Sequence, residues 1–453
     1  MNRDLTQGPV TKSMLLFALP MILGNLLQQF YNVADTLIVG QFLGSTALAA
    51  VGSSYTLMTF LTSILLGMCM GSGAVFSIRF GEGDLPRLKN SLSLSFLLIG
   101  GFTVALNVAV FLLIDPMMAL LQVPADVIPL MRSYLWVIFW GIGGTFLYNY
   151  FASLLRAVGN SATPLVFLGV SAVLNIVLDL VFVVVVPWGV AGAAFATSFS
   201  QWVSGVGLLV YTWKRMAHLR PSRQDVYWKK DRVGEIARFS LLTCVQQSVM
   251  NFGILMVQGL VNSFGAAVMA AFAAAVKIDA FAYMPVQDFG NAFSTFIAQN
   301  YGAGKQERIR KGLNGAVLVS VVFCVIVSAL VFVFAKPLIL LFVEAGETEI
   351  IAEGVRYLHI EGAFYCGIGC LFLLYGLYRA VAKPGMSVVL TVISLGTRVV
   401  LAYLLSAIIG VTGIWWSVPI GWFLADVTGV VYYFVHKEKL LHFGESNLKR
   451  TES

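Results

Sequence analysis

The chain has 453 residues, of which 58% are hydrophobic and only 11% are charged. A soluble domain carries roughly a quarter charged residues, so this composition excludes an ordinary soluble protein and predicts that most of the surface meets lipid. The net charge of +7 comes from basic residues that lie between apolar runs. We therefore interpret it as a signal of membrane orientation, and we expect no nucleic-acid partner.

Apolar runs long enough to cross a bilayer, about 20 residues each, recur along the whole chain. They lie near 14–40, 46–76, 91–114, 128–155, 164–186, 190–213, 237–262, 266–298, 312–335, 352–378, 386–408 and 413–435. The first run contains Pro20 and Asp35 and is far longer than a signal-peptide core, so we interpret it as a membrane helix. The sequence predicts an all-α membrane protein with twelve transmembrane helices.

Lysine and arginine gather in alternate connections between these runs. The longest basic stretch is 214–232, whereas the opposite set of connections carries Asp115, Asp126 and three glutamates near 344–349. Positive charge marks the cytoplasmic side of a membrane protein. The pattern predicts a multi-pass protein with both termini in the cytoplasm.

The two halves of the chain resemble each other. Four short motifs recur in the same order, each at the boundary of a predicted helix. The pairs are Gly44 with Gly265, 79–84 with 300–305, 155–158 with 378–381, and 189–192 with 410–413. Because six helices is an even number, the repeats are parallel, as in transporters built from two lobes. We predict two pseudo-symmetric six-helix lobes, 1–213 and 236–453, joined by a basic cytoplasmic linker, 214–235.

Four polar residues in the first half lie inside predicted membrane helices. Asp35 is in the first, Asn175 and Asp179 are in the fifth, and Thr197 is in the sixth. Asn175 and Asp179 are four residues apart and share one helix face. Their oxygens suit a small hard cation such as Na⁺, or a carboxyl group can hold a proton instead. The alternative is a buried hydrogen-bond cluster that only locks the helices together, but acids within a membrane are functional by default.

The second half does not repeat this set. At the aligned positions Asp35 becomes Met256, Asn175 becomes Arg398, Asp179 becomes Ala402 and Thr197 becomes Val418. We therefore place the cation site in the first half. The second half has its own intramembrane charges, among them Arg398, and these are either structural ion pairs or walls of a cavity.

Aromatic, sulfur and basic side chains within the helices are candidates for a substrate cavity, because aromatic faces attract organic cations and methionine adapts to varied shapes. The set comprises Tyr31, Tyr55, Met58, Tyr148, Tyr283 and Arg398. The sequence contains no GxxxxGK[ST], HExxH or GxSxG motif, and its four histidines do not cluster. We expect a transporter without a cofactor, and not an enzyme.

Three segments resemble the MATE (multidrug and toxic compound extrusion) transporters. They are Asn32–Gly44 followed by Ala47–Ala50, Arg156–Asn160 followed by Thr163-Pro164, and Trp188–Ala194. The resemblance runs from about Thr11 to about Lys437. It implies a bacterial inner-membrane protein with two six-helix lobes, which exports cationic compounds against inward flow of sodium ions or protons.

Within that family, the DinF-like branch is the closer resemblance. It implies an amino-lobe cation site at Asp35, Asn175, Asp179 and Thr197, and a bend of the first helix at Pro20. The NorM-like branch is associated with an acid in helix seven, where this chain has Gln246 and Gln247 and no interior acid. The resemblance therefore does not imply a sodium site in the second lobe.

The sequence raises three possible functions. The first is an antiporter that exports small amphiphilic organic cations in exchange for Na⁺ or H⁺ by alternating access, working in the bilayer as a monomer. The alternative is a lipid-linked oligosaccharide flippase of the same superfamily, which would be expected to carry several basic residues in its cavity. A passive channel or scaffold does not explain duplicated halves with acids on one side only.

Overall fold

The computed structural model describes residues 4–120 and 123–441. Eleven helices in these ranges are long and apolar enough to cross a membrane, and one bent helix pair brings the number to twelve. The predicted all-α membrane protein is confirmed for this part of the chain. The predicted cytoplasmic ends include residues 1–3 and 442–453, which lie outside the described residues.

The chain forms two compact units, which are each described by themselves. The amino unit is built from Leu19–Cys244. The carboxyl unit is built from Leu5–Ala18 together with the chain from Val245 onward. The first helix of each repeat is therefore divided, and its beginning packs with the other half of the sequence. The domain boundaries drawn from the sequence at 213 and 236 stay a prediction.

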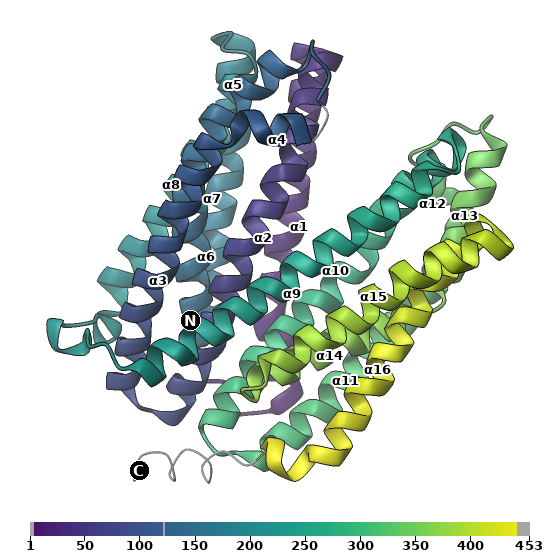
Figure 1. The fold of residues 1–453 in the computed structure, drawn as a ribbon. Helices are drawn as coiled ribbons and strands as arrows, with labels where there is room; N and C mark the ends of the chain where they lie inside the picture. The colour runs from purple at the N-terminus through teal and green to yellow at the C-terminus, as the bar shows by residue number, and fades with distance from the viewer. Residues whose placement is uncertain (1–3, 121–122, 442–453) are drawn as a thin grey trace. The chain divides into compact units, whose positions relative to one another are not determined.

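In the amino unit the helices follow one another with short connections (Figure 1). They are α1 (Val10–Leu43), α2 (Ser45–Glu82), α3 (Leu85–Leu112), α4 (Ile114–Leu120), α5 (Ile128–Ile138), η1 (Phe139–Gly141), α6 (Ile142–Ala157), α7 (Ala162–Asp179), η2 (Leu180–Val185), α8 (Val190–Arg215), η3 (Ala217–Leu219) and η4 (Arg223–Asp225). The carboxyl unit repeats this order. Its helices are α9 (Lys230–Asn262), α10 (Ala266–Gly302), α11 (Gln306–Val333), α12 (Ala335–Ile339), α13 (Thr348–Gly362), α14 (Tyr365–Ala380), α15 (Pro384–Ile409) and α16 (Val411–Leu441).

Equivalent helices of the two units pack in the same way. Helix α2 packs on α6 as α10 packs on α14, and α7 packs on α8 as α15 packs on α16. Small residues allow these helices to approach closely. A Cβ atom added to Gly73 would lie 3.2 Å from Cβ of Ser153, and one added to Gly376 would lie 3.3 Å from Cβ of Ser294. Gly73 aligns with Ser294, and Ser153 aligns with Gly376. The glycine of this contact therefore lies on the first helix of the pair (α2) in the amino unit and on the second (α14) in the carboxyl unit.

Backbone conformation supports the duplication independently of the sequence motifs. Most residues with positive φ fall into pairs at equivalent helix ends. The pairs are Gly44 with Gly265, Gly83 with Gly304, Gly159 with Ala382, and Gly189 with Gly410. Positive φ is strained for residues that carry a Cβ atom, and Ala382 (φ 59°) is the one non-glycine residue with positive φ in the described part of the chain.

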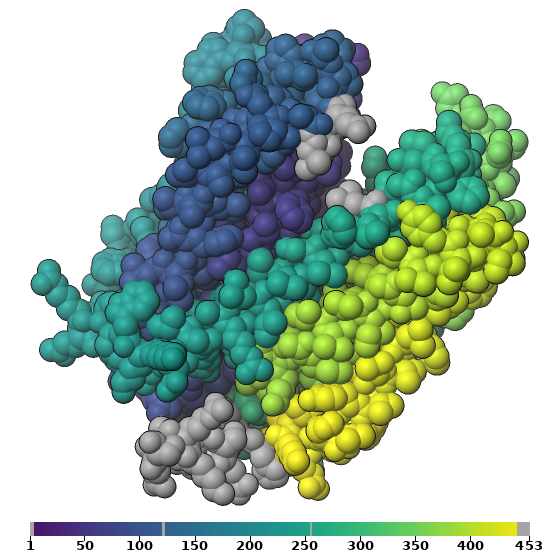
Figure 2. Space-filling model, viewed as in Figure 1, coloured from purple at the N-terminus to yellow at the C-terminus, as the bar shows by residue number. Residues whose placement is uncertain are grey.

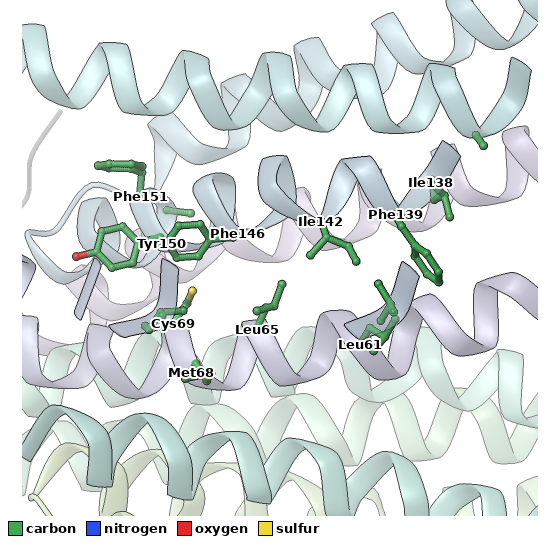
Figure 3. Close-up of a cluster of buried hydrophobic side chains, with 14 of the residues drawn as sticks. Leu61, Leu65, Met68, Cys69, Ile138, Phe139, Ile142, Phe146, Tyr150 and Phe151 are labelled. Carbon is green, nitrogen blue, oxygen red and sulfur yellow. The ribbon is translucent and has the colours of Figure 1, made fainter. Parts of the chain in front are cut away.

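An apolar core fills the amino unit between α2, α5 and α6. Leu61, Leu65, Met68 and Cys69 of α2 face Ile142, Phe146 and neighbouring residues across the helix interface (Figure 3). The ring of Tyr150 is also in this core, where its hydroxyl donates to the carbonyl oxygen of Leu92 at 2.6 Å. This core holds α5 and α6 in place.

Two predicted spans are not straight helices. The run 128–155 becomes α5, the single 3₁₀ turn η1, and α6, while the run 352–378 becomes α13 and α14 with a bend of 50°. Helix α13 ends at Gly362, a residue of low helix propensity. The N–H of Gly367 then donates to the carbonyl oxygen of Phe364, and this tighter turn redirects the chain.

The basic stretch after α8 packs on the amino unit. The side-chain amide of Asn90 donates to the carbonyl oxygens of Asp225 and Tyr227, at 2.8 and 2.9 Å. Arg79 of α2 forms an ion pair with Glu235 at 2.6 Å, and the hydroxyls of Ser72 and Ser240 are 2.8 Å apart. The first part of α9 is thereby fixed to α2.

The carboxyl unit holds the beginning of the described chain in a similar way. The N–H of Leu5 donates to Oε1 of Gln299 at 3.2 Å. The guanidinium of Arg308 donates to the carbonyl oxygens of Leu5, Gln7 and Gly8, at 3.0, 3.0 and 2.8 Å. Leu5 is fully buried. The residues before α1 are thus bound to the connection between α10 and α11.

The outer faces of the helices are apolar. Helices α15 and α16 form one continuous surface in the space-filling view (Figure 2). On α16, Phe423, Phe434 and Val435 are 64%, 68% and 71% exposed. An apolar surface of this extent on a soluble protein would cause association, and it fits contact with lipid.

Candidate cation site

Helix α7 positions two of the four predicted ligands. Asn175 and Asp179 lie one turn apart near its end, with exposures of 2% and 0%. Directly after Asp179 the chain continues as the π-helical segment η2. Such segments frequently occur at functional sites because they change the direction of side chains and carbonyl groups.

Thr197 of α8 fixes the orientation of Asn175. The side-chain amide of Asn175 donates to Oγ1 of Thr197 at 3.1 Å. The interface is held further by Ser171, whose hydroxyl donates to the carbonyl oxygen of Ser200 at 2.9 Å. Because its N–H group is used by Thr197, Asn175 presents its oxygen, and this Oδ1 atom is buried without a donor in the described part of the chain.

Asp35 of α1 meets Asp179. The two carboxyl groups lie within hydrogen-bonding reach of one another. Helix α1 lies against α7 at Gly24, where an added Cβ would make an ordinary contact with a methyl group of Leu168 at 3.6 Å. Oδ1 of Asp35 and both oxygens of Asp179 are buried without any donor among the described residues. Two ionised carboxylates in proximity repel each other, so we expect a proton or a cation to accompany this pair.

The four side chains together offer carboxylate, amide and hydroxyl oxygen atoms. Among the described residues no group of three or more His, Cys, Asp or Glu side chains is placed to hold a metal ion. A site with two carboxylates, an amide oxygen and a hydroxyl instead suits a proton or a small hard monovalent ion. The structure thus brings together all four residues that the sequence singled out, whereas their role as ion ligands stays a prediction.

One neighbour of this site was missed in the sequence. Tyr134 of α5 is 6% exposed and close enough to Asp35 and Asp179 to interact with them electrostatically. The internal repeat could have identified Tyr134 as a residue of interest. Tyr134-Leu135 aligns with Tyr357-Leu358 at the same offset that relates Arg156 to Arg379.

The predicted cavity residues divide into two groups. Tyr31 hydrogen-bonds to the side chain of Gln28 and lies near Tyr55, Tyr148 and Asp35. The hydroxyl of Tyr148 donates to the carbonyl oxygen of Pro164 at 3.1 Å, and Met58 packs against the apolar core of the amino unit.

The other group lies in the carboxyl unit. Tyr283 and Arg398 are close enough to Asp279 and Glu361 there to interact with them electrostatically. Pro20, the predicted bend, lies inside α1 just after the point where that helix passes from the carboxyl unit to the amino unit.

Comparison with known proteins gives a consistent result. The MatE family matches residues 20–181 and 242–404, once in each half of the chain. A probable multidrug resistance protein, YpnP of Bacillus subtilis (strain 168), is 31% identical over 95% of this chain and 96% of its own length. An FAD transporter of Shewanella oneidensis is 25% identical over 92% of this chain and 93% of its own length. A solved structure of a MATE protein in complex with MaL6 superposes with a TM-score of 0.90 at 21% identity, over 96% of this chain and 98% of the other.

Proposed function

This chain belongs to the MatE family of membrane transporters, and we propose that it is a secondary antiporter for small organic compounds. It exports mainly cationic, amphiphilic compounds in exchange for Na⁺ or H⁺ by alternating access. Asp35, Asn175, Asp179 and Thr197 bind the coupling ion, as in the DinF-like branch, and Pro20 allows α1 to bend. The protein works as a monomer in the bacterial cytoplasmic membrane with both termini in the cytoplasm.

The observation that carries this proposal is the Asp35–Asp179 pair. Three of its four oxygens are buried without a donor among the described residues, so an exchangeable proton or cation is the partner that we propose for the pair. A buried carboxylate in a membrane costs several kcal/mol, roughly 2.5–3.5 on insertion scales. The empty site is therefore unfavourable in a closed environment. Release of the ion must be accompanied by access to water or by arrival of a second cation, and this is the coupling that an antiporter needs.

The nature of the substrate follows from the same charge balance. A compound that enters near an acidic site with aromatic neighbours such as Tyr31 gains most when it is cationic and apolar. The relatives named as multidrug resistance proteins favour this class and are not named as enzymes. The flippase alternative is not favoured, because YpnP and YoeA of Bacillus subtilis are named as probable multidrug resistance proteins. The FAD transporter, however, makes an anionic dinucleotide a competing substrate to be tested.

The decisive experiment is efflux from proteoliposomes that contain the purified protein. Sodium and proton gradients are imposed separately, and ethidium and FAD serve as probes. We expect ethidium movement under one of the two gradients. The variant Asp179→Asn should abolish gradient-driven movement, while its abundance and thermal unfolding in detergent stay those of the wild type.

Two other outcomes would each contradict one part of the proposal, either the substrate class or the role of the carboxyl pair. Movement of FAD without movement of ethidium would replace cationic substrates by anionic ones. Full gradient-driven efflux in Asp179→Asn would remove the carboxyl pair from the mechanism. Asp225→Asn is the matched control, because Asp225 lies in the exposed turn after α8 and is bonded only to Ser222 among the hydrogen bonds of its side chain.

A further inference from the structure

An open groove lies on the last turns of α8 in the amino unit. It is lined by Leu209, Val210, Trp213 and Lys214, and its volume is about 400 Å³. Three of these residues are apolar, and the fourth, Lys214, lies in the last turn of the helix. A groove with apolar walls and a cation at one end fits a molecule that has an acyl chain and an anionic head, because each part then contacts matching chemistry.

Arg220 places a second cation beside the groove. Its guanidinium lies over the ring of Trp213, with Cζ 5.5 Å from the ring centroid, and its Nε donates to the carbonyl oxygen of Trp213 at 2.5 Å. The turn η3 holds this residue in place, because Met216 and Leu219 on either side of that turn are buried in the core of the amino unit. The other N–H groups of Arg220 make no hydrogen bond to the described residues, so they remain as donors for an anion.

The positive charge around the groove is not balanced by acids. Residues 214–224 contain four Lys and Arg residues and no Asp or Glu. Within the described part of the chain, neither Lys214 nor Arg220 forms an ion pair. The next acid along the chain, Asp225, accepts from the N–H and the hydroxyl of Ser222, both at 2.7 Å. A partner of opposite charge therefore has to come from outside these residues.

The groove continues a stripe of α8 that faces outward. Trp202, Val206, Val210 and Trp213 recur at intervals of three or four residues, and each is between 40% and 53% exposed. Residues at this spacing share one face of a helix. In a membrane protein such a face contacts lipid, and tryptophan is enriched where the apolar layer meets the headgroups. An occupant can therefore enter the groove sideways from the bilayer, which favours a phospholipid over a soluble anion.

The carboxyl unit does not repeat the lysine of this groove. In the alignment of the two repeats, Trp213 corresponds to Phe434 and Lys214 to Val435. Val435 is 71% exposed, and the first lysine after it on α16 is Lys437. The combination of an apolar groove with a cation in its wall thus belongs to the end of α8, and we expect no equivalent lipid position on α16.

We propose that this groove, together with Arg220, is a binding site for one anionic phospholipid. An acyl chain lies along Leu209, Val210 and Trp213, and the phosphate group accepts hydrogen bonds from Lys214 and Arg220. A lipid with a net negative headgroup, such as phosphatidylglycerol, fits this charge. A zwitterionic phospholipid brings its own cation and gains less. None of these residues belongs to the candidate cation site, so the proposal is independent of the coupling ion and of the exported compound.

The test uses the full chain in bilayer nanodiscs that contain brominated phospholipids, which quench tryptophan fluorescence on contact. The chain has nine tryptophans, so the signal of Trp213 is taken as the difference between the wild type and Trp213→Phe. Dibrominated phosphatidylglycerol should half-quench this signal at a mole fraction about tenfold or more below that of dibrominated phosphatidylethanolamine, since each basic residue near the headgroups contributes about fivefold. Equal mole fractions for the two lipids would leave only ordinary lipid contact and would overturn the proposal.

Substitution of the two cations tests their part in the site. Lys214→Gln and Arg220→Gln should each reduce the preference for phosphatidylglycerol by about fivefold. Lys439→Gln is the matched control, because Lys439 is an exposed lysine in the last turn of α16 and removes the same charge away from the groove. A loss of preference in Lys439→Gln as large as that in Lys214→Gln would mean that the attraction is diffuse, which contradicts a site.

A third variant tests the groove without changing any charge. Val210→Phe adds an aromatic ring where the acyl chain is proposed to lie, and Val210 is exposed, so thermal unfolding should stay that of the wild type. We expect Val210→Phe to lose the preference for phosphatidylglycerol and to retain one phosphatidylglycerol molecule fewer in native mass spectrometry. An unchanged preference together with an unchanged number of retained lipids would show that the groove holds no acyl chain.

Discussion

At the scale of single residues, the candidate site depends on an amide whose direction is set by a hydroxyl group. Asn175 can present oxygen to an ion only while its N–H group is bonded to Thr197, at 3.1 Å. Valine has the same shape as threonine and lacks the hydroxyl, so the amide would be free to turn its N–H group toward the acids. Thr197 therefore acts by positioning Asn175 in addition to any direct contact with the ion.

We predict that Thr197→Val raises the ion concentration that half-saturates gradient-driven efflux by about tenfold or more. A loss of this size is usual when a side chain that orients a ligand is removed. Thr197→Ser keeps the hydroxyl and should remain close to the wild type. The measurement is the ion concentration that half-saturates gradient-driven efflux. Equal values for Thr197→Val and the wild type would show that the hydroxyl has no such role.

The residues of the amino-unit site were recognisable from the sequence because each is polar in an apolar run. Asn175 and Asp179 also share a helix face by spacing alone. The grouping of Asp279, Glu361 and Arg398 was not predictable in this way. They come from α10, α13 and α15, and a single sequence does not state which helices pack together.

At the scale of helices, equivalent helix ends in the two units share the same backbone conformation, as expected from the duplication. Gly159 and Ala382 close equivalent turns after α6 and α14, with φ values of 83° and 59°. A residue with a Cβ atom costs roughly 1–2 kcal/mol in this left-handed conformation. Glycine removes that strain. It also increases the conformational entropy of the unfolded chain, which lowers the stability of the folded protein by about 0.4–1 kcal/mol.

We predict that Ala382→Gly stabilises the protein by up to about 1 kcal/mol, the difference between these two effects. Gly159→Ala should destabilise it by a comparable amount. Thermal unfolding in detergent measures both, and the opposite signs of the two variants serve as the internal control. A lower unfolding temperature for Ala382→Gly would show that the strain at this turn is compensated locally.

The helices were predictable to the extent that hydropathy determines them. Runs of apolar residues located every span, and the repeat located the turns. The bend between α13 and α14 was not visible, because residues 352–378 read as one continuous run and contain no proline. The sequence therefore gave no indication that Glu361, which lies just before this bend, is close to Asp279 and Arg398.

At the scale of the whole molecule, the division of α1 between the units gives its first residues a special importance. Arg308 fixes Leu5, Gln7 and Gly8 through three backbone carbonyl oxygens, and Leu5 is fully buried. The cytoplasmic beginning predicted for this helix is thus attached to the carboxyl unit, while Asp35 farther along it belongs to the amino unit.

We predict that Arg308→Ala releases this attachment. Hydrogen exchange of the amides of residues 5–8 should become at least about tenfold faster, since the loss of one net hydrogen bond to a charged group, about 1.5–3 kcal/mol, lowers the cost of local opening by that factor or more. Arg310→Ala, an exposed arginine on the same helix, is the control. Unchanged exchange in Arg308→Ala would mean that burial of Leu5 alone holds the segment.

The divided first helices also determine the order in which the protein can be completed during synthesis. The amino unit includes the chain as far as Cys244, so its contacts of Ser72 with Ser240 and Arg79 with Glu235 cannot form until the seventh span has left the ribosome. In the carboxyl unit the order is reversed. Its residues 5–18 are synthesised first, and they lack their contacts until α10 and α11 have been synthesised. Neither half, translated alone, contains all the residues of its own core. The duplication has therefore produced two copies that can no longer be separated into independent proteins by cutting the chain at its middle.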